Sequence, residues 1–182
     1  KPSSAASDVY KRQILITEHA IPGTPRGLVY HPKTLVIGVG CERGAPAEEL
    51  IALVMDTLAA EGLSPYAVAA VASLDLKADE AAIHALAAKL NVPARFFTAA
   101  RLNEEAPRLA NPSAAVMAEV GCPGVSEGAA LACAGSEAEL IRTKVKSARA
   151  TCAIARAPQP VIAPPGRARG RLHVIGLGPG AP

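Results

Sequence analysis

The chain has 182 residues, of which 50% are hydrophobic and 3% are aromatic. This length predicts one domain of ordinary size with tails, and the composition predicts a core packed from small aliphatic side chains. The scarcity of aromatic rings argues against a protein that binds single-stranded nucleic acid, since such proteins stack bases on aromatic side chains.

The formal net charge of +3 is unevenly distributed, because residues 142–182 carry eight Lys and Arg and no acidic residue. A basic tail can indicate a nucleic-acid ligand. Half of these cations, however, lie in a stretch rich in Pro and Gly (Arg156, Arg167, Arg169 and Arg171). We therefore interpret the tail as a solvated linker and expect no nucleic-acid partner.

The four cysteines form no CxxC pair and have no His at the spacing of a zinc site. We therefore expect reduced thiols and no metal. No apolar run approaches the ~20 residues of a membrane span, and no signal peptide is recognisable. These features predict a cytoplasmic protein with no membrane partner.

The hydrophobic pattern along the chain predicts alternating strands and helices. Residues 1–13 have no hydrophobic period and are interpreted as a cloning scar or disordered end, and residues 14–33 predict one short strand and an extended connection. Three further strands are predicted at 35–39, 66–74 and 95–98, and helices at 46–61, 78–90, 99–105, 113–120 and 126–133, the last with Ser126 as its N-cap. Two neighbouring strands at 139–145 and 149–155 end the pattern. This order predicts an α/β fold, a three-layer α/β/α sandwich with a mixed, mainly parallel sheet.

The run LVIGVGCERG at residues 35–44 places Gly38, Gly40 and Gly44 between a predicted strand and a predicted helix. Bare backbone N–H groups and the helix dipole make such a turn an anion site, and glycine lets a ligand approach the backbone. A plain tight turn explains the same glycines. Their GxGxxxG spacing, with no acid about 20 residues later at the end of a second strand, disfavours a dinucleotide site. Cys41 has no His partner for nucleophilic chemistry and is expected to be a small buried thiol.

Ligands of such sheets bind beyond the carboxyl ends of the strands, so we expect the loops at residues 38–44, 75–80 and 98–103 to share one rim. This rim combines carboxylates with cations. Hydrolysis at a carbonyl requires both, a base for water and a positive charge for the developing anion. The helix dipole alone explains acids in the first turn of a helix, such as Asp79 and Glu80. Glu42 and Lys77 directly follow strand ends and are not explained in that way.

The chain resembles the C-terminal domain of CbiG and its stand-alone relative CobE, proteins of cobalamin biosynthesis, in five runs that follow the same order: GVGCERG, ASLDLKADE, FFTAARLN, GCPGVSEGAAL and RTKVKSARATCAIAR. The resemblance covers about residues 34–156. It implies hydrolysis of the δ-lactone of cobalt-precorrin-5A with release of acetaldehyde. CobE-like proteins carry no implied activity, so a non-catalytic module that binds or chaperones a corrinoid intermediate is the alternative.

Together, the residues and the resemblance predict two groups of site residues. Glu127 is a candidate general base, although the helix dipole alone explains an acid at the start of a helix. Glu42 departs from the basic or polar residue usual in the family, which weakens its case. We predict catalytic roles for Glu127, Asp75 and Glu80. We predict substrate binding by Gly38, Gly40, Cys41, Glu42, Arg43, Gly44, Lys77 and Lys144.

The resemblance also divides the rest of the chain. Residues 14–33 look like the end of the central region that precedes residues 34–156 in CbiG, residues 157–170 like a linker, and residues 171–182 like the truncated start of a tetrapyrrole methyltransferase. The chain is therefore interpreted as a fragment of a fusion between CbiG and precorrin-3B methyltransferase (CobJ), which would be a covalent partner. No cofactor is expected in this domain, because cobalt belongs to the corrinoid substrate and S-adenosylmethionine would belong to the methyltransferase.

Overall fold

The computed structural model describes residues 13–23 and 27–169. The scar predicted at residues 1–13 lies outside these ranges except for Gln13, and the methyltransferase start predicted at 171–182 lies outside them entirely. Within the described part of the chain, no helix is long and apolar enough to cross a membrane.

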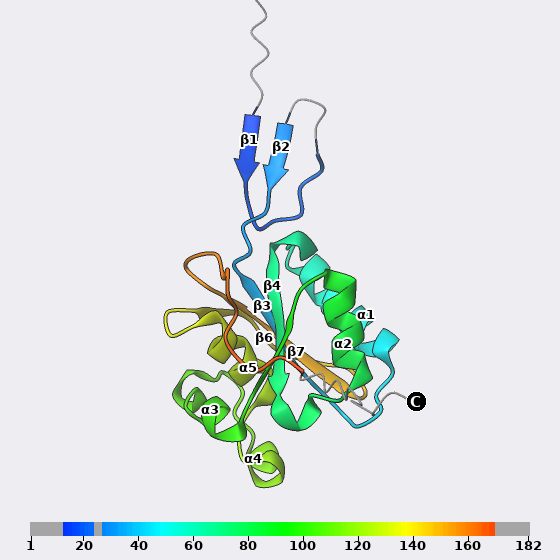
Figure 1. The fold of residues 1–182 in the computed structure, drawn as a ribbon, viewed down its shortest axis with the longest axis vertical. Helices are drawn as coiled ribbons and strands as arrows, with labels where there is room; N and C mark the ends of the chain where they lie inside the picture. Colours follow the sequence, from blue (N-terminus) through cyan, green and yellow to red (C-terminus); the bar gives the residue numbers. More distant parts are fainter. Residues whose placement is uncertain (1–12, 24–26, 170–182) are drawn as a thin grey trace, which may run out of the picture.

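A five-stranded mixed sheet forms the centre of the molecule (Figure 1). Its strands are β3 (Leu35–Cys41), β4 (Val68–Leu74), β5 (Ala94–Phe97), β6 (Glu139–Lys146) and β7 (Ala150–Arg156), in the order β5-β4-β3-β7-β6. The strands β3, β4 and β5 pair in parallel, whereas β7 lies antiparallel to both β3 and β6. The predicted mixed sheet is therefore confirmed.

Helices cover both faces of this sheet, because alternate side chains of a strand point to opposite sides. Leu35, Ile37 and Val39 pack in one core with α1 (Ala47–Ala60) and α2 (Ala81–Leu90). Val36 packs in a second core with α5 (Val125–Ala134) and α3 (Ala99–Asn103). Figure 1 shows α1 and α2 to one side of β3 and β4, and α3 and α5 to the other. The predicted three-layer α/β/α arrangement is confirmed.

Two helices begin elsewhere than predicted. Residues Asp75–Lys77 form a 3-10 turn after β4, so α2 begins at Ala81 rather than at 78. The N-cap of α5 is Gly124 rather than Ser126, which lies in the first turn. Ser126 is buried, and its hydroxyl oxygen has no hydrogen-bond partner in the described structure. Between these elements, the helix predicted at 113–120 is α4 (Ala114–Val120), with Ser113 as its N-cap.

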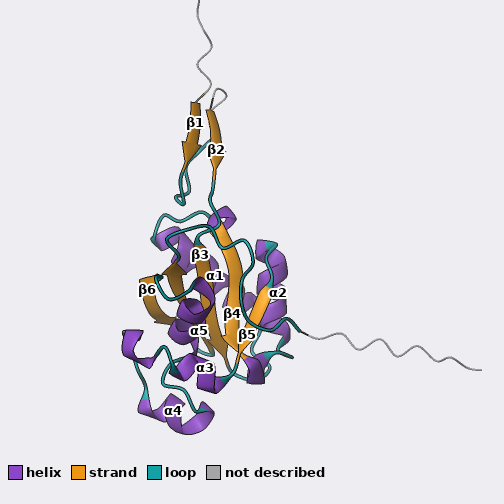
Figure 2. Ribbon diagram, turned by 60° about the vertical axis from the view of Figure 1, so that its left-hand side comes forward, coloured by secondary structure: helices purple, strands orange, loops and turns teal. Residues whose placement is uncertain are grey.

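The N-terminal segment contains two strands where one was predicted. Strand β1 (Gln13–Ile16) pairs in parallel with β2 (Gly27–Tyr30), and the pair stands off from the central sheet (Figure 2). Four residues flanked by Pro and Gly carry too short a pattern to identify β2 from its sequence. Its strand conformation depends on pairing with β1.

Residues 157–169, predicted to be a linker, are largely exposed but are hydrogen-bonded to the domain at two points. The N–H of Val161 donates to Lys33 O at 2.9 Å, and the backbones of Phe96 and Arg167 exchange two hydrogen bonds of 2.9 Å. A sheet edge such as β5 presents unpaired backbone groups. Prolines nearby do not prevent Arg167 from pairing with them.

The close contact between β3 and α5 depends on Gly38. A Cβ atom at Gly38 would lie 1.8 Å from Ser126 O and 2.6 Å from Ala130 N, both backbone atoms of α5. Gly38 is itself buried. The expectation that Gly38 lies against a ligand is therefore corrected, because the backbone that approaches it is the first turn of α5.

Replacing Gly38 by Ala is expected to lower the free energy of unfolding by about 3 kcal/mol, because β3 and α5 must separate to admit the methyl group. Urea unfolding of the two proteins measures this difference. Gly128→Ala, in α5, is the control, since a Cβ atom at Gly128 would meet Leu102 atoms only at 3.5 Å or more. We expect it to change stability by less than about 1 kcal/mol. Equal losses for both variants would contradict the assignment.

Candidate functional site at the carboxyl edge

One end of the sheet collects most of the predicted site residues. The parallel strands β3 and β4 end there, at Cys41 and Leu74, and antiparallel pairing of Cys41 with Ala150 brings the start of β7 to the same end. The first turn of α5 lies against Gly40, where an added Cβ would meet Val125 at 3.6 Å and the Thr151 hydroxyl at 2.9 Å. We call this surface the carboxyl-edge site.

Arg43 joins two of its loops. Its guanidinium donates to the Asp79 carboxylate at 2.6 Å and to the carbonyl of Leu76 at 2.5 Å. It also lies 3.1 Å from the Glu80 carboxylate. The N–H of Gly44 donates to the other oxygen of Glu80 at 3.1 Å, and Gly44 has a φ of 68°, which favours glycine. The loops predicted to share one rim at residues 38–44 and 75–80 are in direct contact.

These ion pairs set the charges at the rim. The hydrogen bond to Arg43 holds the pKa of Asp79 below its ordinary value, and the same bond raises the pKa of Arg43. Because the Arg43 and Asp79 side chains are 58% and 70% exposed, their pairing contributes little to stability. The Glu80 carboxylate is buried and is occupied by Arg43 and Gly44. Arg43 therefore holds the loops together and already carries two carboxylates of its own chain.

Cys41 is a neutral thiol in this surrounding. Burial raises its pKa, and the negative charge of Glu80 raises it further, while the positive charges of Lys77 and Arg43 act in the opposite direction. A raised thiol pKa leaves little thiolate at neutral pH, so Cys41 is a poor nucleophile.

Asp75 and Lys77 are the partly exposed charged groups of this edge whose side chains make no hydrogen bond or ion pair with residues 13–23 or 27–169. They lie two residues apart in the 3-10 turn that follows β4. Glu42 is exposed, and its backbone N–H donates to Arg149 O at 2.9 Å. A carboxylate and an ammonium group presented by one turn can act on water and on a developing anion.

Glu127 lies on the other side of the edge and is 1% exposed. Its carboxylate accepts four hydrogen bonds: from the backbone N–H groups of Ala110, Asn111 and Lys144, each at 2.9 Å, and from the Asn111 amide at 2.8 Å. The register of β6 is irregular between Arg142 and Val145, so the N–H of Lys144 leaves the ladder and is accepted by Glu127. One carboxylate therefore joins α5, β6 and the loop before α4.

These hydrogen bonds decide the ionisation of Glu127. Burial alone would raise its pKa, but the bonds from Asn111, Lys144 and Ala110 outweigh burial and lower it. A carboxylate whose oxygens are already hydrogen-bonded and whose pKa is lowered is a weak base. We infer that Glu127 holds the site together. Lys144, predicted to bind substrate, places its ammonium 3.4 Å from Asn111 O, beside this cluster.

The sequence reasoning did not identify Asn111 or the network that supports it. Glu105 is buried, and its carboxylate pairs with Arg101 at 2.8 Å and with Arg108 at 2.6 Å. Arg108 also donates to the carbonyls of Gly135 and Ala138. These contacts fix the chain leading to Asn111. An Asn followed by Pro indicates a turn, but nothing local indicates its contact with Glu127.

Other features lie away from this edge. A cavity of 340 Å³ lies at the opposite, amino end of the sheet, lined by residues that include Tyr30, Lys33, Asn91, Pro93 and Val161. Among the residues that the structure describes, no three His, Cys, Asp or Glu side chains gather to hold a metal ion.

The chain is similar to known proteins over most of its described length. The family model described as "Cobalamin synthesis G C-terminus" matches residues 35–155. Protein CobE of Sinorhizobium sp is 56% identical over 121 residues, which are 66% of this chain and 79% of that protein. Cobalt-precorrin-5A hydrolase of Priestia megaterium is 34% identical over 155 residues, which are 85% of this chain. This chain spans only 40% of that hydrolase.

A solved structure agrees with the fold. The crystal structure of CobE, a protein of the cobalamin (vitamin B12) biosynthetic pathway, superimposes with a TM-score of 0.64 at 43% identity. The match covers 69% of this chain and 91% of that one.

Replacing Glu127 by Gln is expected to lower the free energy of unfolding by about 2–3 kcal/mol at neutral pH, because at least one buried donor loses its acceptor. The loss depends on pH. Since the folded-state pKa of Glu127 is lowered, its contribution is complete above the ordinary glutamate pKa of about 4.3 and disappears as the pH falls through the lower folded-state value. Unfolding at a series of pH values measures the effect.

Glu119→Gln, on an exposed position of α4, is the matched control and is expected to change stability by less than about 0.5 kcal/mol. A Glu127→Gln variant that is as stable as the parent at neutral pH would refute the structural role.

Proposed function

Since the chain belongs to the CbiG C-terminal family of cobalamin biosynthesis, we propose that its carboxyl-edge site binds a corrinoid intermediate and contributes to hydrolysis of the δ-lactone of cobalt-precorrin-5A. The observation that carries the proposal is the turn Asp75–Lys77, which presents an acid and a base to the edge and whose Leu76 carbonyl accepts a hydrogen bond from Arg43. Hydrolase names occur among relatives of which this chain spans a minority, so the activity is proposed for the longer protein.

The proposed reaction begins with addition of water to the lactone carbonyl carbon. A base takes a proton from that water, and the bond between the acyl carbon and the ring oxygen breaks, which leaves a carboxylate and a hydroxyl group on the two-carbon unit. That hydroxyl then loses its proton and becomes the aldehyde carbonyl as the carbon–carbon bond to the macrocycle breaks. The macrocycle carbon keeps the electron pair and takes up a proton, and acetaldehyde leaves. Negative charge develops on the carbonyl oxygen during the addition. A nearby cation or N–H group lowers the barrier by stabilising that charge.

Asp75 is the carboxylate best suited to the role of base. Glu80 and Glu127, the other predicted catalytic acids, are buried and engaged as hydrogen-bond acceptors. Asp75 is partly exposed at the end of β4, beside Lys77. We assign Glu80 and Glu127 to positioning and Lys77 to stabilisation of charge.

Binding follows from the many carboxylate arms of a corrinoid. Lys77 and Lys144 supply ammonium groups at this end of the sheet. Charge-assisted hydrogen bonds to carboxylates are among the stronger polar contacts. Arg43 would bind a substrate carboxylate only in exchange for its contact with Asp79.

The catalytic part is tested with Asp75→Asn. Acetaldehyde release from cobalt-precorrin-5A by the protein translated from the complete reading frame is expected to fall about a hundredfold or more, with corrinoid affinity retained. Glu48→Gln, an exposed acid in the first turn of α1, removes the same charge nearby and is expected to leave the rate unchanged.

A second candidate function is a non-catalytic module that binds or delivers the intermediate. It is favoured by the use of two of the three predicted catalytic carboxylates as structural acceptors. Normal acetaldehyde release by Asp75→Asn would exclude Asp75 as the base. Tight corrinoid binding without any release would support the second candidate.

The binding part is tested with Lys77→Gln. We expect affinity for the corrinoid to fall about tenfold and to depend less on salt, since an exposed ionic contact is screened by ions. Titration at two salt concentrations measures both effects. Lys89→Gln, at the far end of α2, is the control and is expected to bind normally. Equal affinities for both variants would remove Lys77 from the binding surface.

A fused methyltransferase is also part of the proposal. It rests on the resemblance of residues 171–182 to the opening of such a domain. The complete reading frame would encode that domain and with it the binding site for S-adenosylmethionine.

A further inference from the structure

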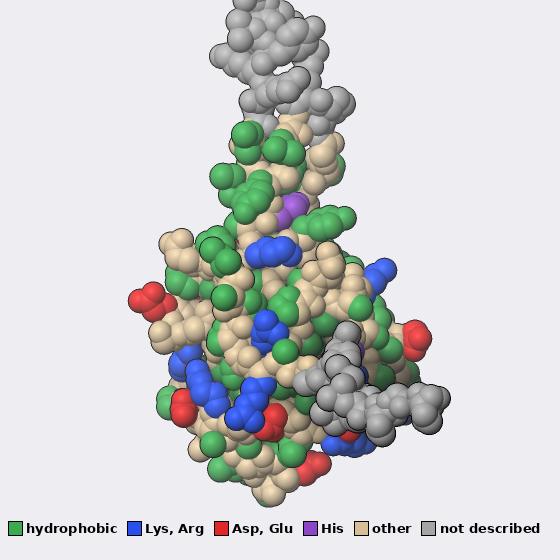
Figure 3. All heavy atoms as spheres, viewed as in Figure 1, with side chains coloured by type: hydrophobic (Ala, Val, Ile, Leu, Met, Phe, Trp, Pro, Cys, Tyr) green, Lys and Arg blue, Asp and Glu red, His purple; other side chains and the backbone are tan. Residues whose placement is uncertain are grey.

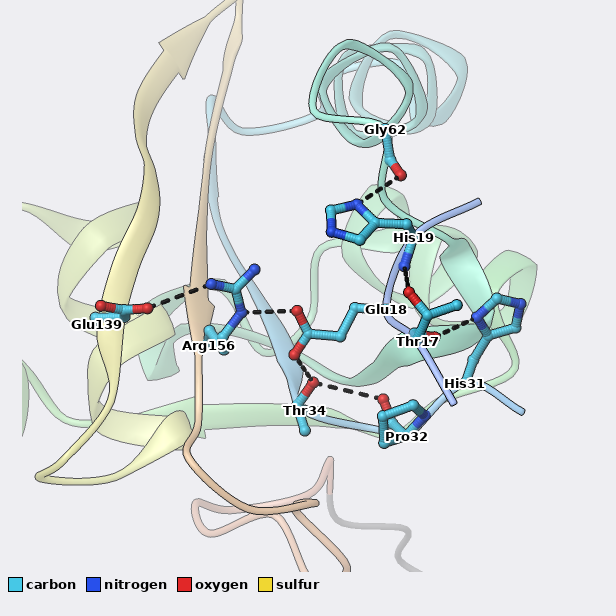
Figure 4. Close-up of polar contacts among 9 residues, drawn as sticks. All are labelled: Thr17, Glu18, His19, His31, Pro32, Thr34, Gly62, Glu139 and Arg156. Carbon is cyan, nitrogen blue, oxygen red and sulfur yellow. Dashed lines mark hydrogen bonds and ion pairs between the residues drawn. The ribbon is translucent and has the colours of Figure 1, made fainter. Parts of the chain in front are cut away.

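The hairpin of β6 and β7 carries no acidic residue between positions 142 and 156, and its cations fall into two groups. Those in the amino half of the sheet are paired with acids. Arg156 donates to Glu18 at 2.7 Å and to Glu139 at 3.3 Å (Figure 4). Arg142 donates to Glu61 at 3.0 Å. Figure 3 shows a face on which Lys and Arg side chains likewise lie beside Asp and Glu side chains, toward the lower end of the domain.

In the carboxyl half, Lys146 belongs to a row of residues that crosses the edge of the sheet. It pairs with Thr151 of β7, and Thr151 pairs with Gly40 of β3. Residues directly opposite one another in adjacent strands point to the same side of the sheet. A Cβ atom at Gly40 would meet the Thr151 hydroxyl at 2.9 Å and Val125 at 3.6 Å, so this side is the one on which α5 begins. Lys146 therefore lies at one flank of the carboxyl-edge site.

The charge of Lys146 is not used within the domain. Lys146 is exposed, and its ammonium group has no hydrogen-bond or ion-pair partner among the residues that the structure describes. The turn that follows it is fixed to α1, because the Glu49 carboxylate accepts from the Ser147 hydroxyl at 2.5 Å and from the N–H of Arg149 at 2.7 Å. The backbone at Lys146 is thus held at the edge while its charge stays available to a ligand.

The strand ends between Lys146 and the turn Asp75–Lys77 are uncharged. Strands β3 and β7 lie between β4 and β6, so the strands that carry the two lysines are about 14 Å apart, three inter-strand spacings. The residues between them include Gly40, Cys41 and Thr151, which are small and partly exposed. A tetrapyrrole ring is flat and carries its carboxylates on arms at its periphery. Cations at two flanks with small neutral residues between them match that distribution of charge.

Given the proposed function, on which this inference rests, we propose that Lys146 binds a carboxylate arm of the corrinoid. The ligand then lies across the ends of β3 and β7, with Lys77 at one flank and Lys146 at the other. Lys146 was not among the site residues predicted from the sequence. A lysine on an edge strand such as β6 has a second explanation, because its charge hinders pairing with another molecule. The two explanations differ in their effect on affinity.

The first test uses Lys146→Gln in the protein translated from the complete reading frame. Affinity for cobalt-precorrin-5A is expected to fall about tenfold and to depend less on salt, as for an exposed ionic contact. Lys146→Arg keeps the charge and is expected to recover most of the affinity, and Lys89→Gln, at the far end of α2, is the control for loss of a lysine. Unchanged affinity of Lys146→Gln overturns the proposal. Self-association of that variant by light scattering, with unchanged affinity, would identify protection of the edge strand instead.

The second test combines Lys146→Gln with Lys77→Gln. Contacts at distant points of one ligand contribute independently, so the two losses are expected to multiply to about a hundredfold. A double variant that binds no more weakly than the single variants would place both lysines at one arm and overturn the orientation. Weaker binding by Lys146→Gln supports the assignment even if the parent releases no acetaldehyde, because affinity is measured without turnover. A parent protein that binds no corrinoid overturns both this assignment and the proposed function.

Discussion

The first turn of α5 lies directly on the backbone of β3, and most of the carboxyl edge depends on this contact. The backbones of the two elements are so close that no side chain fits between them, and Gly38 permits this contact because it has none. The helix is therefore held close enough for Glu127 to reach the amides of Asn111 and Lys144. A strand residue with any side chain at 38 would move the helix and take that carboxylate away from its donors.

The acidic side chains at this edge are all carboxylates, and they differ in burial and in the hydrogen-bond donors around them. Glu127 and Glu80 are buried and surrounded by donors, which makes them supports for loops. Asp79 is exposed and paired with Arg43. Asp75 is partly exposed, in the same turn as Lys77. Hydrogen-bond donors thus decide which carboxylate is available to a substrate, since a carboxylate accepting several bonds is a weak base.

The two ends of the sheet present different surfaces. At the carboxyl end, loops and the start of α5 present charged groups. At the amino end, Glu18 and Arg156 anchor the β1–β2 pair, whose exposed side chains are apolar. Apolar surface removed from water favours association with protein, whereas charged groups favour a polyanionic ligand.

Local patterns in the sequence determined the elements, the layers and the loops that meet at the carboxyl edge. Apolar runs and turn residues act over a few neighbours, so β3, α1 and α4 could be predicted from them. Tertiary structure alone decided that the backbone of α5 packs against Gly38. It also decided that the Glu127 carboxylate accepts a hydrogen bond from the Asn111 amide, and that residues 27–30 form a strand. Each of these depends on groups distant in sequence, and hydrogen bonding and close packing between such groups leave no periodic trace in the chain.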